Sequence, residues 1–238
     1  MFYRYGFDPT YLILVLPFVL LSLWASANVN RTFEKYQNQY SMRGLTAAQA
    51  ARQVLSANGI RDVEVERVGG KLTDHYDSAA HRIRLSDSVY DSTSTAAIGV
   101  ACHEAGHAIQ YHVGYSMIKL RSAIIPITNF GSRLAMPLIL LCILLSFMDG
   151  FSYLLIDLGI ACFTLSLIFQ LVTLPVEFDA SRRAMEVIAG TGMLTQEEQQ
   201  GARKTLRAAA LTYVAATALS LAQLLRLVLL FGRRNRRD

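Results

Sequence analysis

Four apolar stretches of this chain are long enough to cross a lipid bilayer, which takes about 20 residues of helix. They cover residues 11–28, about 127–148, 153–176 and 208–231, and Gln223 and Arg226 interrupt the last. The pattern predicts a multi-pass helical membrane protein. Ala25-Ser26-Ala27 is also typical of a signal-peptidase site, but Arg4 is the only basic residue before the first stretch. We therefore favour a retained anchor.

The polar residues after the first stretch follow helix and strand periods instead. Thr46 and Gln49 form a capping-box pattern and Gly59 is typical of a helix end, which predicts a helix over 47–57. Residues 62–68 alternate apolar and charged positions, as a half-buried strand does. Two more strands are predicted at 72–76 and 82–85, followed by an alanine-rich helix from about 94 to 111. The fold class is therefore α+β, a small soluble region joined to membrane helices.

Composition supports a membrane location. Of 238 residues, 53% are hydrophobic and 17% are charged, against about 25% charged in a typical soluble domain. The net charge of +5 comes without a basic cluster interleaved with aromatic residues, so we expect a bilayer and no nucleic acid as partner. Cys102, Cys142 and Cys162 are scattered and indicate neither a disulfide framework nor a cysteine zinc site.

The strongest chemical signal is His103-Glu104-Ala105-Gly106-His107, an HExxH motif. On a helix, residues i and i+4 lie one turn apart on one face, so two imidazoles can bind one Zn²⁺ ion. Glu104 lies beside them and is expected to act as the general base on a zinc-activated water. The apolar flanks of the motif favour this interpretation over a chance match.

A catalytic zinc takes a third protein ligand, and two acidic positions qualify. If the second and third stretches fold back as a pair, Glu177 returns to the side of the HExxH helix and Asp149 lies across the bilayer. Asp179, two residues from Glu177, projects about 200° away on a helix and is free to pair with Arg182 or Arg183. We expect Glu177 as the ligand, with Asp179 as the alternative.

The basic residues suggest a sidedness. The side with residues 29–125 and 177–207 carries many lysines and arginines near its membrane ends, whereas Arg4 is alone on the other, so the active site is predicted to be cytoplasmic. Four full spans would place the arginines of the C-terminal tail outside, so the last stretch is either a span or an interfacial helix. The expected segments are a transmembrane anchor (1–28), a cytoplasmic region with the HExxH helix (29–125), a transmembrane hairpin (126–176), the third-ligand helix with a cytoplasmic segment (177–207), and a C-terminal transmembrane or interfacial helix with a basic tail (208–238).

Together, ACHEAGHAIQ, LTDHYD, IRLSDSVY, LPVEFDASRRA and AAALTYVAA resemble the membrane zinc metallopeptidases of the YugP type. That family is similar to the membrane gluzincins that include HtpX and the CaaX-processing proteases, in which the first glutamate of E-x-x-A-D supplies the third ligand. Here the pattern matches at Glu177 and Ala180 and departs at Ser181, where the relatives have Asp.

The resemblance implies a gluzincin-like zinc-peptidase domain that binds its substrate as an added edge strand. The matching residues are Leu72, Thr73, Asp74, His75 and Tyr76. His75, Tyr76 and Tyr213 are candidate donors to the oxyanion. We therefore expect a zinc metalloendopeptidase with one Zn²⁺ per chain, acting on a peptide or membrane-protein substrate.

Two other functions fit the sequence. One is a site-2-type intramembrane protease in which Asp149 supplies the third ligand. Against it, the helix around His103 has too short an apolar run to cross a bilayer. The other is a non-catalytic membrane adaptor with a structural metal, against which the intact Glu104 argues.

Overall fold

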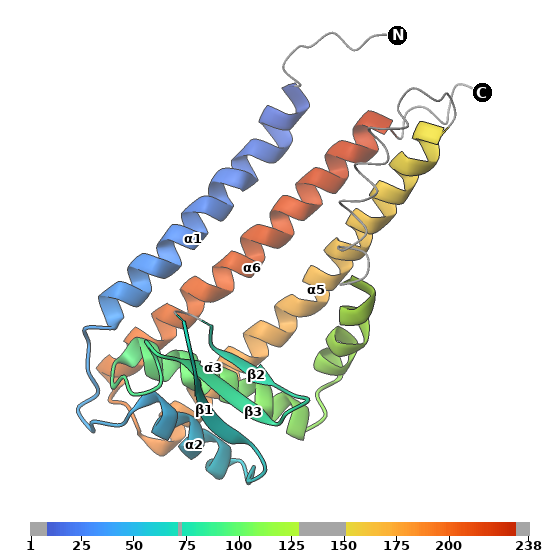
Figure 1. Ribbon diagram of the computed structural model, residues 1–238. Helices are drawn as coiled ribbons and strands as arrows, with labels where there is room; N and C mark the ends of the chain where they lie inside the picture. The colour runs from blue at the N-terminus through green and yellow to red at the C-terminus, as the bar shows by residue number, and fades with distance from the viewer. Residues whose placement is uncertain (1–8, 71–72, 129–150, 232–238) are drawn as a thin grey trace. The chain divides into compact units, whose positions relative to one another are not determined.

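The computed structural model describes residues 9–70, 73–128 and 151–231 (Figure 1). The chain divides into two compact units. We call them the sheet unit, which comprises residues 25–119 and 173–212, and the apolar-helix unit, which comprises the rest of the chain. Most of the predicted stretch at 127–148, and Asp149 after it, lie outside the described residues.

The sheet unit has a three-stranded sheet with β1 (Glu64–Val68), β3 (Arg82–Ser86) and β2 (His75–Asp77) in that order. β1 runs parallel to β3, and β2 runs antiparallel to it. The predicted second strand was too long, because the structure begins it at His75. Asp74, just before it, accepts hydrogen bonds from the backbone N–H and the hydroxyl of Ser86. The backbone N–H of Ser86, the last residue of β3, is therefore hydrogen-bonded to the side chain of a residue that precedes β2.

The alternation of the strand residues follows from the two faces of the sheet. On one face, Val65, Ile83 and Leu85 are buried in the core. On the other face, Arg84 pairs with Glu66 at 2.6 Å and with Asp77 at 2.7 Å, so charges of opposite sign bridge all three strands. The period-two pattern of the sequence is therefore explained by one apolar and one ion-paired face.

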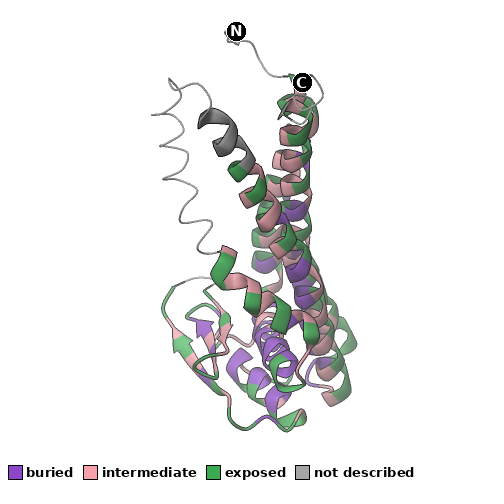
Figure 2. Ribbon diagram, turned by 90° about the vertical axis from the view of Figure 1, so that its right-hand side faces the viewer, coloured by how far each residue is buried: buried purple, intermediate pink, exposed green. Residues whose placement is uncertain are grey.

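Two helices cover the apolar face of the sheet. α2 (Ala47–Ala57) contacts β1, and α3 (Thr95–His112) contacts β2 and β3. The predicted capping box at Thr46 is confirmed, and the Ser94 hydroxyl caps α3 by accepting a hydrogen bond from the Ala97 N–H. Most of α3 is buried, and Figure 2 shows buried positions gathered along this helix and its neighbours. The helix that carries the HExxH motif is therefore the centre of the core.

The long helices each contribute residues to both units. α1 (Leu16–Tyr36) follows a π-helical turn at Tyr11–Val15, α5 spans Phe151–Thr191 and α6 spans Gln196–Phe231. Both α5 and α6 are continuous, so the predicted third stretch and Glu177 share one helix despite Pro175, and α6 remains helical through Arg226. Residues 116–128 are also helical.

In the part of the chain that the structure describes, three helical segments are long and apolar enough to cross a membrane: Tyr11–Tyr36, Leu158–Thr191 and Gln196–Leu230. Each corresponds to one of the apolar stretches predicted from the sequence. Each extends past its apolar stretch into more polar sequence, because the helix continues into the sheet unit.

Candidate metal centre

His103 and His107 lie one turn apart on α3, and Glu177 of α5 lies against both of them. The Oε2 atom of Glu177 is 3.2 Å from Nε2 of His103 and 3.6 Å from Nε2 of His107. The two imidazole rings meet edge to face with their centroids 4.7 Å apart. One ligand atom from each residue lies within 4.8 Å of the others, so residues about seventy positions apart converge on one point.

A close approach of two helix backbones makes this convergence geometrically feasible. Gly106 lies within the HExxH motif and faces Ala180 of α5. A Cβ atom at position 106 would lie 2.4 Å from the carbonyl oxygen of Ala180. Glycine is therefore needed at position 106 because α5 lies directly on the backbone of α3. Glu177, one turn before Ala180, is thereby brought to the two histidines.

Gln110 determines which nitrogen of His107 carries a proton. Its amide nitrogen donates to the carbonyl of Val176 at 2.7 Å and to Asp179 at 3.0 Å, so its oxygen faces Nδ1 of His107, at 3.0 Å. A carbonyl oxygen can only accept, so Nδ1 of His107 must donate. In the neutral ring, Nε2 then presents a lone pair toward the Glu177 carboxylate.

A lone pair that faces a buried carboxylate is unfavourable unless a cation or a proton lies between them. Burial by itself would lower the pKa of His107. The hydrogen bond to Glu177 and the negative charges of Glu104 and Glu177 outweigh burial, so the pKa of His107 is raised. The site therefore favours positive charge at the point where Nε2 and Oε2 face each other.

The donor set fits zinc. Two imidazole nitrogens and one carboxylate oxygen are the protein ligands of one common class of catalytic zinc site. His103 also has a partner for its other nitrogen, since its Nδ1 lies 3.1 Å from the hydroxyl of Ser181. Both Nε2 atoms are thus left for a metal, and both rings are held by hydrogen bonds that orient them.

Asp179 is occupied elsewhere, as its spacing predicted. It accepts hydrogen bonds from Arg182, from Arg183 at 2.6 Å and from Gln110 at 3.0 Å. Among the described residues, the candidate metal cluster contains His103, His107 and Glu177 and not Asp179. Glu177 and Asp179 therefore have different partners.

Glu104 is buried beside the cluster, with 9% of its surface exposed. Its negative charge raises the pKa of His107 on one side. On the other side, burial and, to a smaller extent, the charge of Glu104 raise the pKa of Asp74. Glu104 is therefore a buried carboxylate next to the proposed metal ligands, where a general base would lie.

The five residues predicted to bind substrate have different surroundings. Leu72 lies outside the described residues, and Thr73 bonds back to the carbonyl of Gly69. Asp74 bonds to Ser86 as described above. His75 is exposed, with Nδ1 2.8 Å from the Thr73 carbonyl, and the ring of Tyr76 packs against Tyr111 at 5.6 Å. His75 and Tyr76 lie in β2, at an edge of the sheet.

Three further residues with polar side chains are not part of the candidate metal cluster. Cys102 is fully buried, and burial raises the pKa of its thiol to about 12. His81 lies at the end of a turn and pairs with Asp62. Tyr213 belongs to the apolar-helix unit. Gln110 was not predicted as a site residue from the sequence, although its i+3 spacing from His107 places it on the same helix face.

This chain is similar to known proteins over most of its length. A 211-residue alignment shows 47% identity to the "Putative membrane protease YugP" of Bacillus subtilis (strain 168), covering 89% of this chain and 92% of that protein. No solved structure matches the chain. Residues 11–232 match the family model described as "Putative neutral zinc metallopeptidase", and the chain belongs to that family.

Proposed function

We propose that this protein is a membrane-embedded zinc metalloendopeptidase whose metal is held by His103, His107 and Glu177. The observation that carries the proposal is the convergence of two Nε2 atoms on Oε2 of Glu177, with both remaining imidazole nitrogens already engaged. Zinc bound there supplies Lewis-acid catalysis for the hydrolysis of a peptide bond.

Glu104 is the general base of the proposed reaction. Its carboxylate takes a proton from the attacking water as the oxygen of that water bonds to the peptide carbonyl carbon. It then passes the proton to the amide nitrogen as the C–N bond breaks, which gives an amine and a carboxylic acid that keeps the second proton of the water. Gln110 and Ser181 keep the two imidazoles in place during these steps.

The substrate is proposed to add to the sheet along β2. Among the described residues, β2 pairs with β3 on one side only, so its other edge has free backbone donors and acceptors. β2 also contacts α3, the helix that carries the HExxH motif. An extended peptide paired with this edge gains main-chain hydrogen bonds whatever its sequence, which suits unfolded or membrane-associated substrates.

Membrane insertion is proposed through the three long apolar helices and the undescribed stretch before α5. Only 11%, 22% and 17% of the most apolar windows of these three helices are buried within the protein, so most of their apolar surface is left for lipid. The distribution of lysine and arginine favours a multi-pass arrangement with the sheet unit in the cytoplasm.

The direct test is to purify the full chain in detergent, measure its zinc content and measure cleavage of unstructured casein. We expect about one zinc per chain. Glu104→Gln should retain zinc and lose cleavage, because glutamine keeps the size of glutamate but cannot take a proton. Full activity of Glu104→Gln would refute the mechanism. Zinc binding without any cleavage by the parent protein would favour a non-catalytic adaptor.

Paired alanine variants test the third ligand. Glu177→Ala should lose zinc, whereas Asp179→Ala should retain most of it, because Asp179 pairs with arginines. The reverse result would assign the metal to Asp179. Zinc loss in Asp149→Ala with retention in Glu177→Ala would instead favour an intramembrane protease of the site-2 type.

A further inference from the structure

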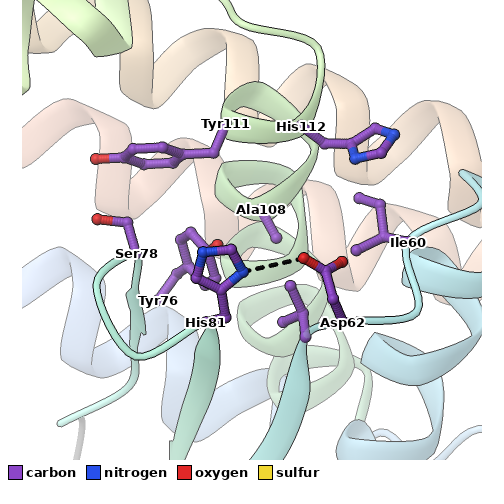
Figure 3. A pocket seen from close by; sticks show the side chains of 9 residues that line it. Ile60, Asp62, Tyr76, Ser78, His81, Ala108, Tyr111 and His112 are labelled. Carbon is purple, nitrogen blue, oxygen red and sulfur yellow. Dashed lines mark hydrogen bonds and ion pairs between the residues drawn. The ribbon is translucent and has the colours of Figure 1, made fainter.

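A pocket of about 260 Å³ lies where α3 extends past the end of the sheet (Figure 3). Four parts of the sheet unit line it: the segment that leads into β1, strand β2, the turn after β2, and the C-terminal half of α3. Ala108 lines the pocket from α3 and directly follows His107, and Tyr76 lines it from β2. The pocket is therefore next to both the helix that carries the proposed ligands and the strand proposed to bind substrate.

The lining of the pocket combines aliphatic and aromatic side chains with the polar side chains of Asp62, Ser78, His81 and His112. Ala108 has the smallest side chain of its lining and leaves space above the helix backbone. Ile60 and Val63 contribute aliphatic surface. The rings of Tyr76 and Tyr111 are tilted by 58° with centroids 5.6 Å apart. This separation and tilt lie in the range that aromatic pairs prefer, so a further ring can pack against them in the same way.

The Asp62 carboxylate that lines the pocket already has a partner. Nδ1 of His81 lies 3.0 Å from the carboxylate of Asp62 (dashed line in Figure 3), and both side chains are more than half exposed. A lysine or arginine side chain that entered the pocket would have to compete with His81 for this carboxylate. An apolar side chain gains from the walls without disturbing the pair.

We propose that this pocket receives an aromatic or large aliphatic side chain of the peptide substrate and so determines the cleavage preference of the enzyme. This inference rests on the proposed function. The volume is below the roughly 300–1,000 Å³ of pockets that hold whole small molecules, and suits one large side chain. β2 contacts α3, and its Tyr76 lines the pocket, so a peptide that pairs with β2 would run beside it.

The experiment uses the full-length, zinc-loaded protein in detergent and quenched fluorescent peptides that differ at one position, scanned on both sides of the cleaved bond. At one position, peptides with phenylalanine or leucine should have a kcat/KM at least about tenfold above the alanine peptide. Ala108→Leu fills the pocket and should reduce that ratio by at least about tenfold. Ala57→Leu, which adds the same side chain at an exposed position outside the pocket, should leave the ratio unchanged.

Ala108 is only 2% exposed, so adding a larger side chain there also strains the core. A second variant therefore tests the pocket without that strain. Tyr111 is 37% exposed, and Tyr111→Ala removes one ring of the pair with a smaller risk to the core. It should also reduce the preference for phenylalanine while zinc content stays at the parent level. Equal cleavage of all peptides by the parent, or a preference for lysine or arginine, would overturn the proposal.

If the parent cleaves no peptide, the proposed function fails and the pocket is judged by binding alone. Zinc-loaded Glu104→Gln protein should then bind the phenylalanine peptide at least about tenfold more tightly than the alanine peptide. Introducing Ala108→Leu into that protein should remove the difference. Equal binding of the two peptides would overturn the pocket proposal independently of catalysis.

Discussion

Replacing Gly106 with alanine tests whether the contact between the backbones of α3 and α5 sets the metal centre. The added methyl group would lie 2.4 Å from the carbonyl oxygen of Ala180 and 3.0 Å from its carbonyl carbon. Carbon and carbonyl oxygen atoms in close contact are normally about 3.3–3.6 Å apart, so the helices must separate by roughly 1 Å. Backbone cannot rotate out of the way as a flexible side chain can.

Two opposing effects decide the sign of the stability change. Alanine favours a helix over glycine by about 1 kcal/mol, which on its own would stabilise α3. Overpacking of a close contact costs about 1–3 kcal/mol. The net result for Gly106→Ala should be a destabilisation of up to about 2 kcal/mol.

The effect on metal affinity should be larger than the effect on folding. Glu177 lies one turn from Ala180 and moves with it, and metal–ligand distances tolerate deviations of only about 0.2 Å. A shift of roughly 1 Å should therefore weaken zinc binding by at least about tenfold, because a displaced outer partner alone weakens it by about 10–100-fold.

The assay is competition for zinc with a chelator of known affinity, together with thermal unfolding in detergent. Gly190→Ala is the matched control, because it lies in α5 and a Cβ atom there meets nothing within 4 Å. This control should be slightly more stable than the parent and bind zinc equally well. If Gly106→Ala behaves like Gly190→Ala in both measurements, helix contact does not set the site.

Three further predictions concern the surroundings of the metal and the sheet. Gln110→Leu should weaken zinc binding by about 10–100-fold in chelator competition, because Nδ1 of His107 loses its acceptor. Zinc at about 100 times its dissociation constant should add about 2.7 kcal/mol to the unfolding free energy of the parent and far less to His107→Ala, as measured by thermal unfolding. The hydrogen bond from Arg84 lowers the pKa of Glu66, so the pair stabilises the fold above the ordinary value of 4.5 and loses this effect as the pH falls through the lowered pKa. Arg84→Gln should accordingly reduce the melting temperature at neutral pH and narrow the difference from the parent in acid.

Local patterns predicted most of the sheet unit, since they depend on neighbours in the chain. The capping box at Thr46 and the alternation before Gly69 place a helix and a strand directly. The start of β2 was missed because it depends on a long-range bond, in which the carboxylate of Asp74 occupies the N–H of Ser86. Such a bond leaves no periodic trace in the sequence.

The candidate site also combines features that local sequence patterns predict with features that depend on how the helices pack. The i, i+4 spacing of the histidines and the separate partners expected for Glu177 and Asp179 both follow from helix geometry. The roles of Gln110 and Ser181 do not, because each depends on which side chains α3 and α5 bring together. Ser181 departs from the E-x-x-A-D pattern of the membrane gluzincins that the sequence resembles. Its hydroxyl nevertheless lies 3.1 Å from Nδ1 of His103, where a hydrogen-bond partner is needed to orient the ring.

The different surroundings of Glu177 and Asp179 explain why one of them is suited to a metal. Asp179 is balanced by Arg182 and Arg183, so a cation beside it would gain little and would meet two positive charges. Glu177 has 4% of its side chain exposed and lies against the imidazoles of His103 and His107. Because Gln110 fixes the proton of His107 on Nδ1, a proton or a metal on the facing Nε2 atom would balance the negative charge of Glu177. The zinc proposed there would therefore compete with protons for one point in the sheet unit, and the two arginines beside Asp179 disfavour a further cation at that carboxylate.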